Sequence, residues 1–204
     1  MLPARFFAVL SLIPFLFSSP GSSWPQSQLD GQPRLPFTDD GACPFEGCQY
    51  GGWTARARVV ARRDADISSP VAFAIQSGEK ITALNGKVIT RQFGIVKMLK
   101  PIVFDDVETG PLPHLSHKVE VPAGAVLYVL HEEGEGSCLY WYNGATHHKD
   151  LYAETVHKGD DDFPWDVISL PKTEWWVKFR NHDGRTGWVL NPRSFGGMDS
   201  LGGK

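Results

Sequence analysis

The chain has 204 residues, of which 42% are hydrophobic and 21% charged, and its formal net charge is −3. This length allows one domain or two small ones, and this composition excludes a wholly disordered chain. No basic stripe is present, so nucleic acid is not an expected partner.

The first 23 residues have the pattern of a secretory signal peptide. Arg5 precedes the apolar run Phe6–Phe17, and small, turn-forming residues follow it. The run is shorter than the roughly 20 apolar residues of a membrane-spanning helix. A buried N-terminal helix is the alternative, but Pro14 and the lack of amphipathic spacing count against it. We therefore expect a secreted or periplasmic protein, and no later stretch is long and apolar enough to span a membrane.

Residues 24–41 are rich in Pro, Gln, Asp and Gly, which predicts a linker or an extended arm. Just after them, Cys43 and Cys48 can close a small disulfide loop in an exported protein. Cys138 would then be a lone thiol buried in a strand; three reduced cysteines are the alternative. A zinc site at the first two would need two more ligands, and no second cysteine pair exists.

The first folded region is expected over residues 42–110. Frequent glycines and prolines favour short strands and many turns. Alternating apolar residues predict a strand at 71–75, and further strands are expected at 79–84, 87–90 and 94–99. Ser77-Gly78 and Asn85-Gly86 are expected to be turns between them, since Asn-Gly is a strong hairpin signal.

A Pro- and Gly-rich loop at 110–113 is the expected boundary to a second region, residues 114–196. Strands are expected at 125–130, 138–142, 165–170, 175–180 and 186–190, with a turn at Asn143-Gly144. An insertion near 145–164 is expected to hold a short helix at 149–156 or only a loop. Residues 197–204 are a tail.

The last hairpin carries a family pattern. The pair Trp175-Trp176, a polar turn at 181–184 and then "GRTGWV" resemble the last hairpin of SH3 and bacterial SH3-like (SH3b) domains. The stretch "SSPVAFAIQSGEKITAL" resembles the start of an SH3b repeat, and "CPFEGCQYGGW" resembles the opening of exported bacterial proteins with SH3-like parts. The resemblance implies an all-β fold with two small SH3-like barrels in tandem, after a signal peptide and a linker.

Aromatic residues are the candidate ligand-binding groups. Neighbouring side chains on a strand point to opposite faces, so Trp175 and Trp176 should divide between the core and a surface. An exposed aromatic platform can stack on extended peptides or sugar rings. The candidates are Trp175, Trp141, Tyr142 and Tyr128, with Asn181, Asp183 and Arg185 as polar edges. In the alternative interpretation, these aromatics cover the seam between the two barrels.

No catalytic motif is present, so we expect no enzyme, no metal and no cofactor. The expected function is an exported binding module for cell-wall peptidoglycan or an extended peptide; its partner would be that cell-wall glycan or peptide, or another exported protein. One alternative is a structural or assembly protein. Another is a metal-dependent hydrolase that uses His147 or His148, although neighbours on a strand would point apart.

Overall fold

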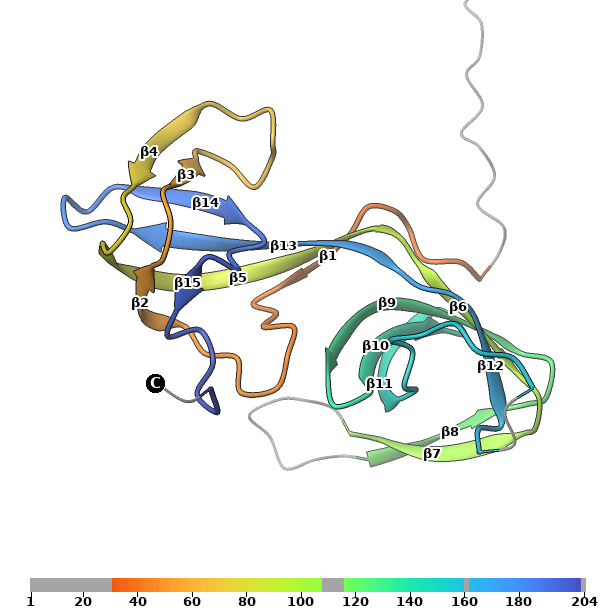
Figure 1. The fold of residues 1–204 in the computed structure, drawn as a ribbon. Coiled ribbons are helices and arrows are strands. Elements are labelled where there is room, and N and C mark those ends of the chain that lie inside the picture. The colour runs from red at the N-terminus through yellow and green to blue at the C-terminus, as the bar shows by residue number, and fades with distance from the viewer. Residues whose placement is uncertain (1–30, 108–115, 160–161, 203–204) are drawn as a thin grey trace, which may run out of the picture.

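The computed structural model describes residues 31–107, 116–159 and 162–202 (Figure 1). These residues form strands, turns and loops with no helix among them, so the predicted all-β class is confirmed. The signal peptide predicted at 1–23 and the linker residues 24–30 lie outside the described residues. No helix long and apolar enough to cross a membrane occurs in the described part of the chain.

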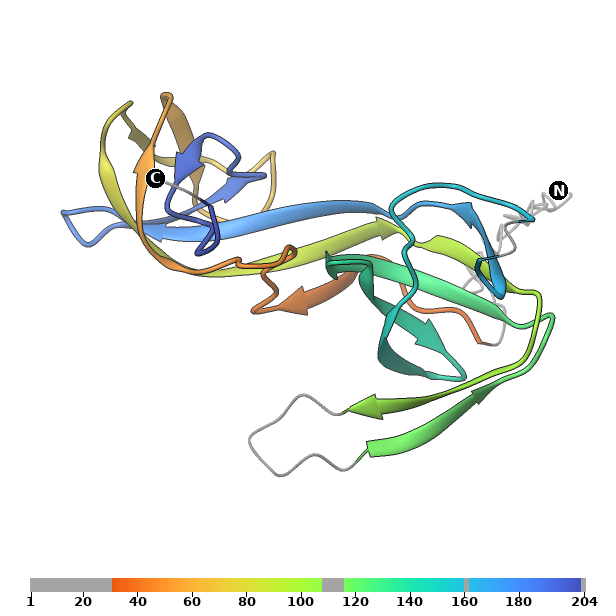
Figure 2. The ribbon, with the colours of Figure 1, turned by 60° about the horizontal axis from the view of Figure 1, so that its bottom comes forward.

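One antiparallel sheet has eight strands and is strongly curled (Figures 1 and 2). Its core is rich in aromatic residues. Its order is β15-β2-β5-β13-β14-β3-β4, and β1 pairs with β5 beside it. The strands are β1 (Phe37–Asp40), β2 (Gly51–Ala55), β3 (Val59–Arg62), β4 (Val71–Ile75), β5 (Lys80–Gln92), β13 (Lys172–Arg180), β14 (Thr186–Leu190) and β15 (Phe195–Gly196).

A second antiparallel sheet has five strands, in the order β11-β10-β9-β6-β12. These are β6 (Gly94–Met98), β9 (Val126–Gly134), β10 (Ser137–Tyr142), β11 (Ala145–Asp150) and β12 (Trp165–Ser169). A separate hairpin, β7 (Ile102–Val107) and β8 (Ser116–Val121), packs Phe104, Val119 and Val121 against the core of this sheet.

The five-stranded sheet is an insertion between two paired strands of the eight-stranded sheet. The chain leaves β5 at Gln92, builds β6 to β12, and returns into β13 at Lys172, whose cross-strand partner is Gln92. The two long strands that connect the sheets run side by side in both views (Figures 1 and 2).

This arrangement differs from the tandem barrels expected over residues 42–110 and 114–196. The last hairpin, β13 and β14, was expected in the second region, but it pairs with β5 and β3 of the first. The boundary expected at 110–113 lies outside the described residues, between β7 and β8 in the sequence, and these two strands pair with each other. The reason is that alternation shows that a strand exists but not which distant strand it pairs with.

Trp53 is the centre of the core of the eight-stranded sheet. It is 1% exposed, and its ring contacts those of Tyr50, Trp175, Phe179 and Phe195, with centroid distances of 5.3 to 6.3 Å. An aromatic side chain buries on the order of 150–250 Å². These five rings therefore supply much of the apolar burial that a small curled sheet needs.

The core of the five-stranded sheet forms from period-two alternation. Inward-facing residues on its strands include Val96, Leu127, Tyr140 and Val167, all fully buried. Trp165 adds a large ring, and its indole N–H donates to the Leu151 carbonyl at 3.0 Å. Each sheet thus has a core of its own.

One predicted turn is wrong. Asn85-Gly86 lies inside the continuous strand β5, opposite Lys178 and Val177 of β13. Gly86 is needed there for close packing, because a Cβ would lie 2.9 Å from the Trp175 indole nitrogen. The turn predicted at Asn143-Gly144 is confirmed, with φ values of 48° and 85°.

Three other segments differ from expectation. Residues 145–150 form β11 rather than part of a loop insertion, and no helix forms at 149–156. The end of the predicted linker, residues 37–40, is β1 and pairs with β5. The tail packs on the loop between Cys43 and Cys48, where the Ser200 N–H donates to the Gly47 carbonyl at 2.7 Å.

Candidate functional site

A cleft lies where the two sheets meet, with Trp175 on its wall. Its volume is about 420 Å³, within the range typical of ligand pockets. We call it the Trp175 cleft. It is lined by Pro44, Phe45, Val88, His131, Glu132, Pro171, Thr173, Trp175, Asn191, Arg193 and Met198.

Trp175 is held by hydrogen bonds of its backbone and by contacts of its indole with other rings. The Trp175 backbone N–H donates to Oδ1 of Asn191 at 3.1 Å, and the Asn191 backbone N–H donates back to the Trp175 carbonyl at 2.7 Å. Phe45 meets the indole edge-on, with centroids 5.7 Å apart and planes at 81°. Trp53 supports it from the core at 6.2 Å. The rings of Trp175 and Phe45 therefore form an apolar corner in the lining of the cleft.

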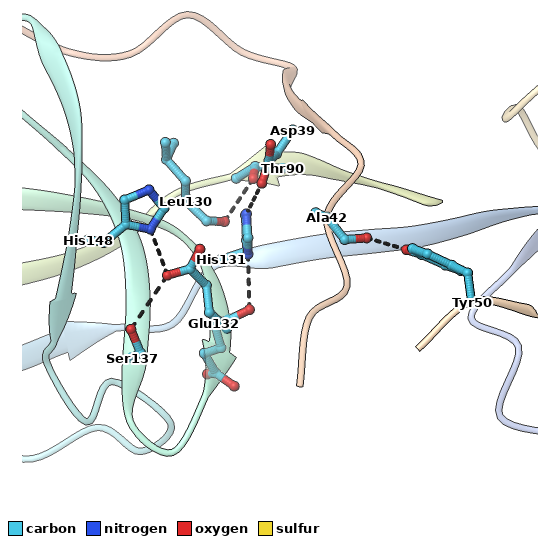
Figure 3. A network of polar contacts seen from close by, with 10 residues as sticks. Asp39, Ala42, Tyr50, Thr90, Leu130, His131, Glu132, Ser137 and His148 are labelled. Atoms are coloured by element: carbon cyan, nitrogen blue, oxygen red, sulfur yellow. Dashed lines mark hydrogen bonds and ion pairs between the residues drawn. The ribbon is translucent and has the colours of Figure 1, made fainter. Parts of the chain in front are cut away.

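The disulfide loop positions Phe45. Cys43 and Cys48 are joined by a disulfide, which closes a loop around Phe45. The Tyr50 hydroxyl donates to the Ala42 carbonyl at 2.5 Å, which ties the end of this loop to the segment that follows β1 (Figure 3). A covalent loop of this kind presents an aromatic side chain with little freedom to lose on binding.

Charged groups give the cleft a polar side. Burial raises the pKa of Glu132, so its carboxylate is poorly solvated and gains from a cationic or N–H partner. Arg193 supplies a cation on the same lining, and Thr173 adds a hydroxyl. The cleft therefore combines apolar rings with both signs of charge.

A hydrogen-bond network joins the sheets behind the cleft (Figure 3). Nε2 of His131, on β9, lies 2.9 Å from Oδ2 of Asp39 on β1, and its Nδ1 lies 2.9 Å from the Glu132 carbonyl. The buried Thr90 hydroxyl on β5 donates to the Leu130 carbonyl at 2.7 Å. These contacts fix β9 against the eight-stranded sheet and so fix the width of the cleft.

A wider groove of about 790 Å³ lies between β1 and the outer face of β10 and β11. In it, Nδ1 of His148 lies 2.9 Å from Oε2 of Glu133, and the Ser137 hydroxyl lies 3.5 Å from the same oxygen. His147 points away from His148 into the core, with its ring 5.5 Å from that of Tyr140. The two histidines thus lie in different environments, one in the core and one in the groove, and cannot bind the same metal ion.

The predicted aromatic residues fall into separate places. Trp141 and Tyr128 are cross-strand partners on the five-stranded sheet, and the Trp141 indole donates to the Gly31 carbonyl at 3.0 Å. Tyr128 packs on Phe93 at 4.7 Å. Tyr142 follows Trp141 on β10 and faces the other way, against the core. Trp175 belongs to the other sheet.

The predicted polar edges lie at the far end of the β13–β14 hairpin. The Arg185 N–H donates to Oδ1 of Asn181 at 2.9 Å, and Asn181 also contacts Asp183. The Arg185 guanidinium donates to the Ala72 carbonyl. At about 3.3 Å per residue, the turn begins about 20 Å along the strand from Trp175, so these residues do not join it in one site.

The adjacent tryptophans do face opposite sides of β13, but neither is a bare surface ring. Trp175 packs toward the core with Trp53, while Trp176 faces the other side and is still only 1% exposed. Its indole N–H donates to Oε2 of Glu174 at 3.0 Å.

Sequence patterns did not identify Phe45, His131, Glu132 and Arg193 as neighbours of Trp175. The only available signal was the position of Phe45 between two cysteines. None of the cysteines is a candidate nucleophile, because two are bonded and burial raises the pKa of the Cys138 thiol to about 12. The described residues contain no group of three or more His, Cys, Asp or Glu placed to hold a metal ion.

Comparison with protein-family models, with curated proteins and with solved structures found no match. Function is therefore argued from the geometry of the cleft.

Proposed function

We propose that this protein is an exported, non-catalytic binding module that holds an extended peptide, including the peptide part of peptidoglycan, in the Trp175 cleft. One observation carries the proposal. Two aromatic rings from distant segments, with a partly buried carboxylate and a guanidinium beside them, line one cleft between two sheets.

A peptide matches this mixture of groups. The angle between Phe45 and Trp175 accepts an apolar side chain, which both rings can contact. Glu132 accepts from an ammonium group or a main-chain N–H, and Arg193 pairs with a carboxylate or donates to a carbonyl. Sugar rings stack best on flat, exposed aromatic faces, whereas Phe45 and Trp175 meet edge to face at 81°.

The test is calorimetric titration of the mature protein with peptides selected on an array of extended sequences that includes peptidoglycan stem peptides. Phe45→Ala removes one wall without touching either core, and Glu132→Gln removes the charge at constant shape. Each should weaken binding by about tenfold, which corresponds to about 1.4 kcal/mol. The matched control is Trp141→Ala, on the other sheet, which should bind as the wild type.

Wild-type affinity in both cleft variants would refute the proposal, as would binding of the peptidoglycan disaccharide alone. Loss of binding in Trp141→Ala, with the cleft variants unaffected, would transfer the site to the Trp141 and Tyr128 surface.

A structural or assembly role is the second candidate, and one observation favours it. Trp53, Trp165 and Trp176 are at most 6% exposed, and Trp175 packs on Trp53, so these indoles serve the scaffold. This role predicts that no peptide on the array binds, and that acrylamide quenches little of the tryptophan fluorescence.

A further inference from the structure

The outer face of the eight-stranded sheet, opposite the Trp175 cleft, gathers cations near the β13–β14 turn. Strand register places Arg180 beside Thr82 and Thr186, and Lys178 beside Asn85 and Trp188. Lys80 precedes Thr82 by two residues on β5 and therefore points to the same side. We call Lys80, Lys178, Arg180 and Trp188 the basic face.

The cations of the basic face lack ion pairs with the acidic residues that the structure describes. Among the described residues, neither Lys80, Lys178 nor Arg180 forms an ion pair. Farther along the same sheet, Lys87 pairs with Asp40 at 2.9 Å and Arg91 pairs with Glu174 at 2.9 Å. Three uncompensated positive charges therefore lie together on a chain whose formal net charge is −3.

Trp188 lies beside these charges. Its ring is half-buried, with Nζ of Lys178 5.7 Å and Nζ of Lys87 5.0 Å from its centroid. Cation–π contacts of this length hold flexible ammonium groups near one position, which lowers the entropy lost when they bind an anion.

A shallow hollow of about 270 Å³ lies at the turn end of the basic face. It is lined by Gly52, Lys80, Ile81, Thr82, Arg180, Asn181 and His182. Gly52 leaves its floor open, because no atom lies within 4 Å of where its Cβ would be. Hydroxyl and amide groups thus stand next to a guanidinium, in a space open to solvent.

We propose that the basic face binds an acidic oligosaccharide whose sugars carry carboxylates. The Arg180 guanidinium matches a carboxylate in a two-bond geometry, and Lys178 and Lys80 attract the next charges along the chain. Thr82 and Asn181 are suited to sugar hydroxyls. A single-stranded nucleic acid needs a row of aromatic rings for successive bases, whereas the basic face has the single ring of Trp188.

The site is independent of the proposed peptide cleft, since side chains at the two places point to opposite faces of the same sheet. Its failure and that of the cleft are therefore distinguishable: Phe45→Ala should leave glycan binding unchanged, and the basic-face variants should leave peptide binding unchanged.

The experiment measures binding of a hexamer of galacturonate to the mature protein by calorimetry at low salt and at 0.2 M salt. The double variant Lys178→Gln with Arg180→Gln should weaken binding at least tenfold, and wild-type binding should weaken as salt rises. The matched control, Lys97→Gln with Lys118→Gln, removes two exposed lysines from the other sheet and its hairpin, and should change binding less than twofold. Thermal unfolding of each variant checks that the fold is kept.

Equal loss in both double variants would overturn the proposal, because binding would then follow overall charge. Equal binding of a neutral hexasaccharide would overturn the role of the carboxylate. Equal or tighter binding of a dodecamer of deoxythymidylate would overturn the choice of a glycan over nucleic acid.

Discussion

His131 is buried in β9, with an oxygen acceptor against each of its ring nitrogens. Asp39 faces Nε2 and the Glu132 carbonyl faces Nδ1, each at 2.9 Å. Both nitrogens can donate only in the imidazolium form. Burial lowers the pKa of His131, but the hydrogen bond to Asp39 and that to the Glu132 carbonyl outweigh it, and the net result is a raised pKa. The junction of the two sheets thus contains a partly buried His131–Asp39 contact that becomes an ion pair when His131 is protonated.

This pair makes the stability of the junction depend on pH. Because the folded pKa of His131 is raised, its contribution is complete below the unfolded value of about 6.5 and is lost as pH rises through the folded pKa. We expect the free energy of unfolding to fall from pH 6 to pH 9. His131→Gln should cost about 1–3 kcal/mol at pH 6, because it leaves Asp39, which is one-third exposed, without its cation, and should show a flatter pH profile.

Urea unfolding of the wild type and of His131→Gln at both pH values measures this. Asp39→Asn is the matched variant, since it removes the same charge pair from the other side. The charged groups beside His131 are Asp39, Glu132 and Glu133. If the free energy of unfolding of both variants fell with pH as steeply as that of the wild type, another group would be responsible for the pH dependence.

Gly94, at the start of β6, lets two segments cross where the chain passes from one sheet to the other. A Cβ there would lie 2.8 Å from the Ser169 carbonyl oxygen and 2.9 Å from the Pro171 nitrogen. These are backbone atoms, and they can move only if the connections of both sheets move with them. A side chain at this point is therefore expected to disturb the junction.

We expect Gly94→Ala to lower the free energy of unfolding by about 1–3 kcal/mol through overpacking. Gly52→Ala is the control, because Gly52 is also in a strand and a Cβ there meets no atom within 4 Å. Urea unfolding compares the two variants. A cost at Gly94 no larger than that at Gly52 would mean that the crossing adapts without strain.

Elements set by local patterns could be predicted from the sequence. The strands predicted at 71–75 and 186–190 have those bounds in the structure, because alternation and flanking turn residues mark them locally. Asn85-Gly86 misled the prediction, because its glycine serves close packing against Trp175 rather than a turn. β11 was not predicted, because its residues are mostly polar and show little apolar alternation.

The candidate site could be predicted only at Trp175. Its other main groups come from the disulfide loop, from β9 in the inserted sheet and from the segment after β14: Phe45, Glu132 and Arg193. Long-range pairing brings these segments together, and no spacing in the sequence encodes it. The same limit explains why the tandem arrangement of barrels was expected instead of an insertion.

At the scale of the whole molecule, the two sheets have separate cores and few links. The core around Trp53 uses strands from both ends of the described chain, whereas the core around Tyr140 lies within residues 96–167. Besides the two connecting strands, the junction includes the His131–Asp39 and Thr90–Leu130 contacts and the close approach of Glu46 to Gly134 of β9. The eight-stranded sheet should therefore fold when the inserted sheet is removed.

The insertion predicts which shortened chain can fold. Gln92 and Lys172 are cross-strand partners, so replacing residues 93–171 with Asn-Gly should close β5 and β13 into a hairpin with a two-residue loop. We expect this protein to unfold cooperatively in urea and to keep the near-ultraviolet circular dichroism of the Trp53 ring cluster, at reduced stability because Thr90 loses its partner.

Residues 31–110 alone, the piece that a tandem division would isolate, lack β13 and β14 and should remain unfolded, since Val177, Phe179 and Val189 are missing from the core. If residues 31–110 folded alone and the deletion protein did not, the five-stranded sheet would not be an insertion. The chain would then divide into two consecutive domains, as the sequence predicted.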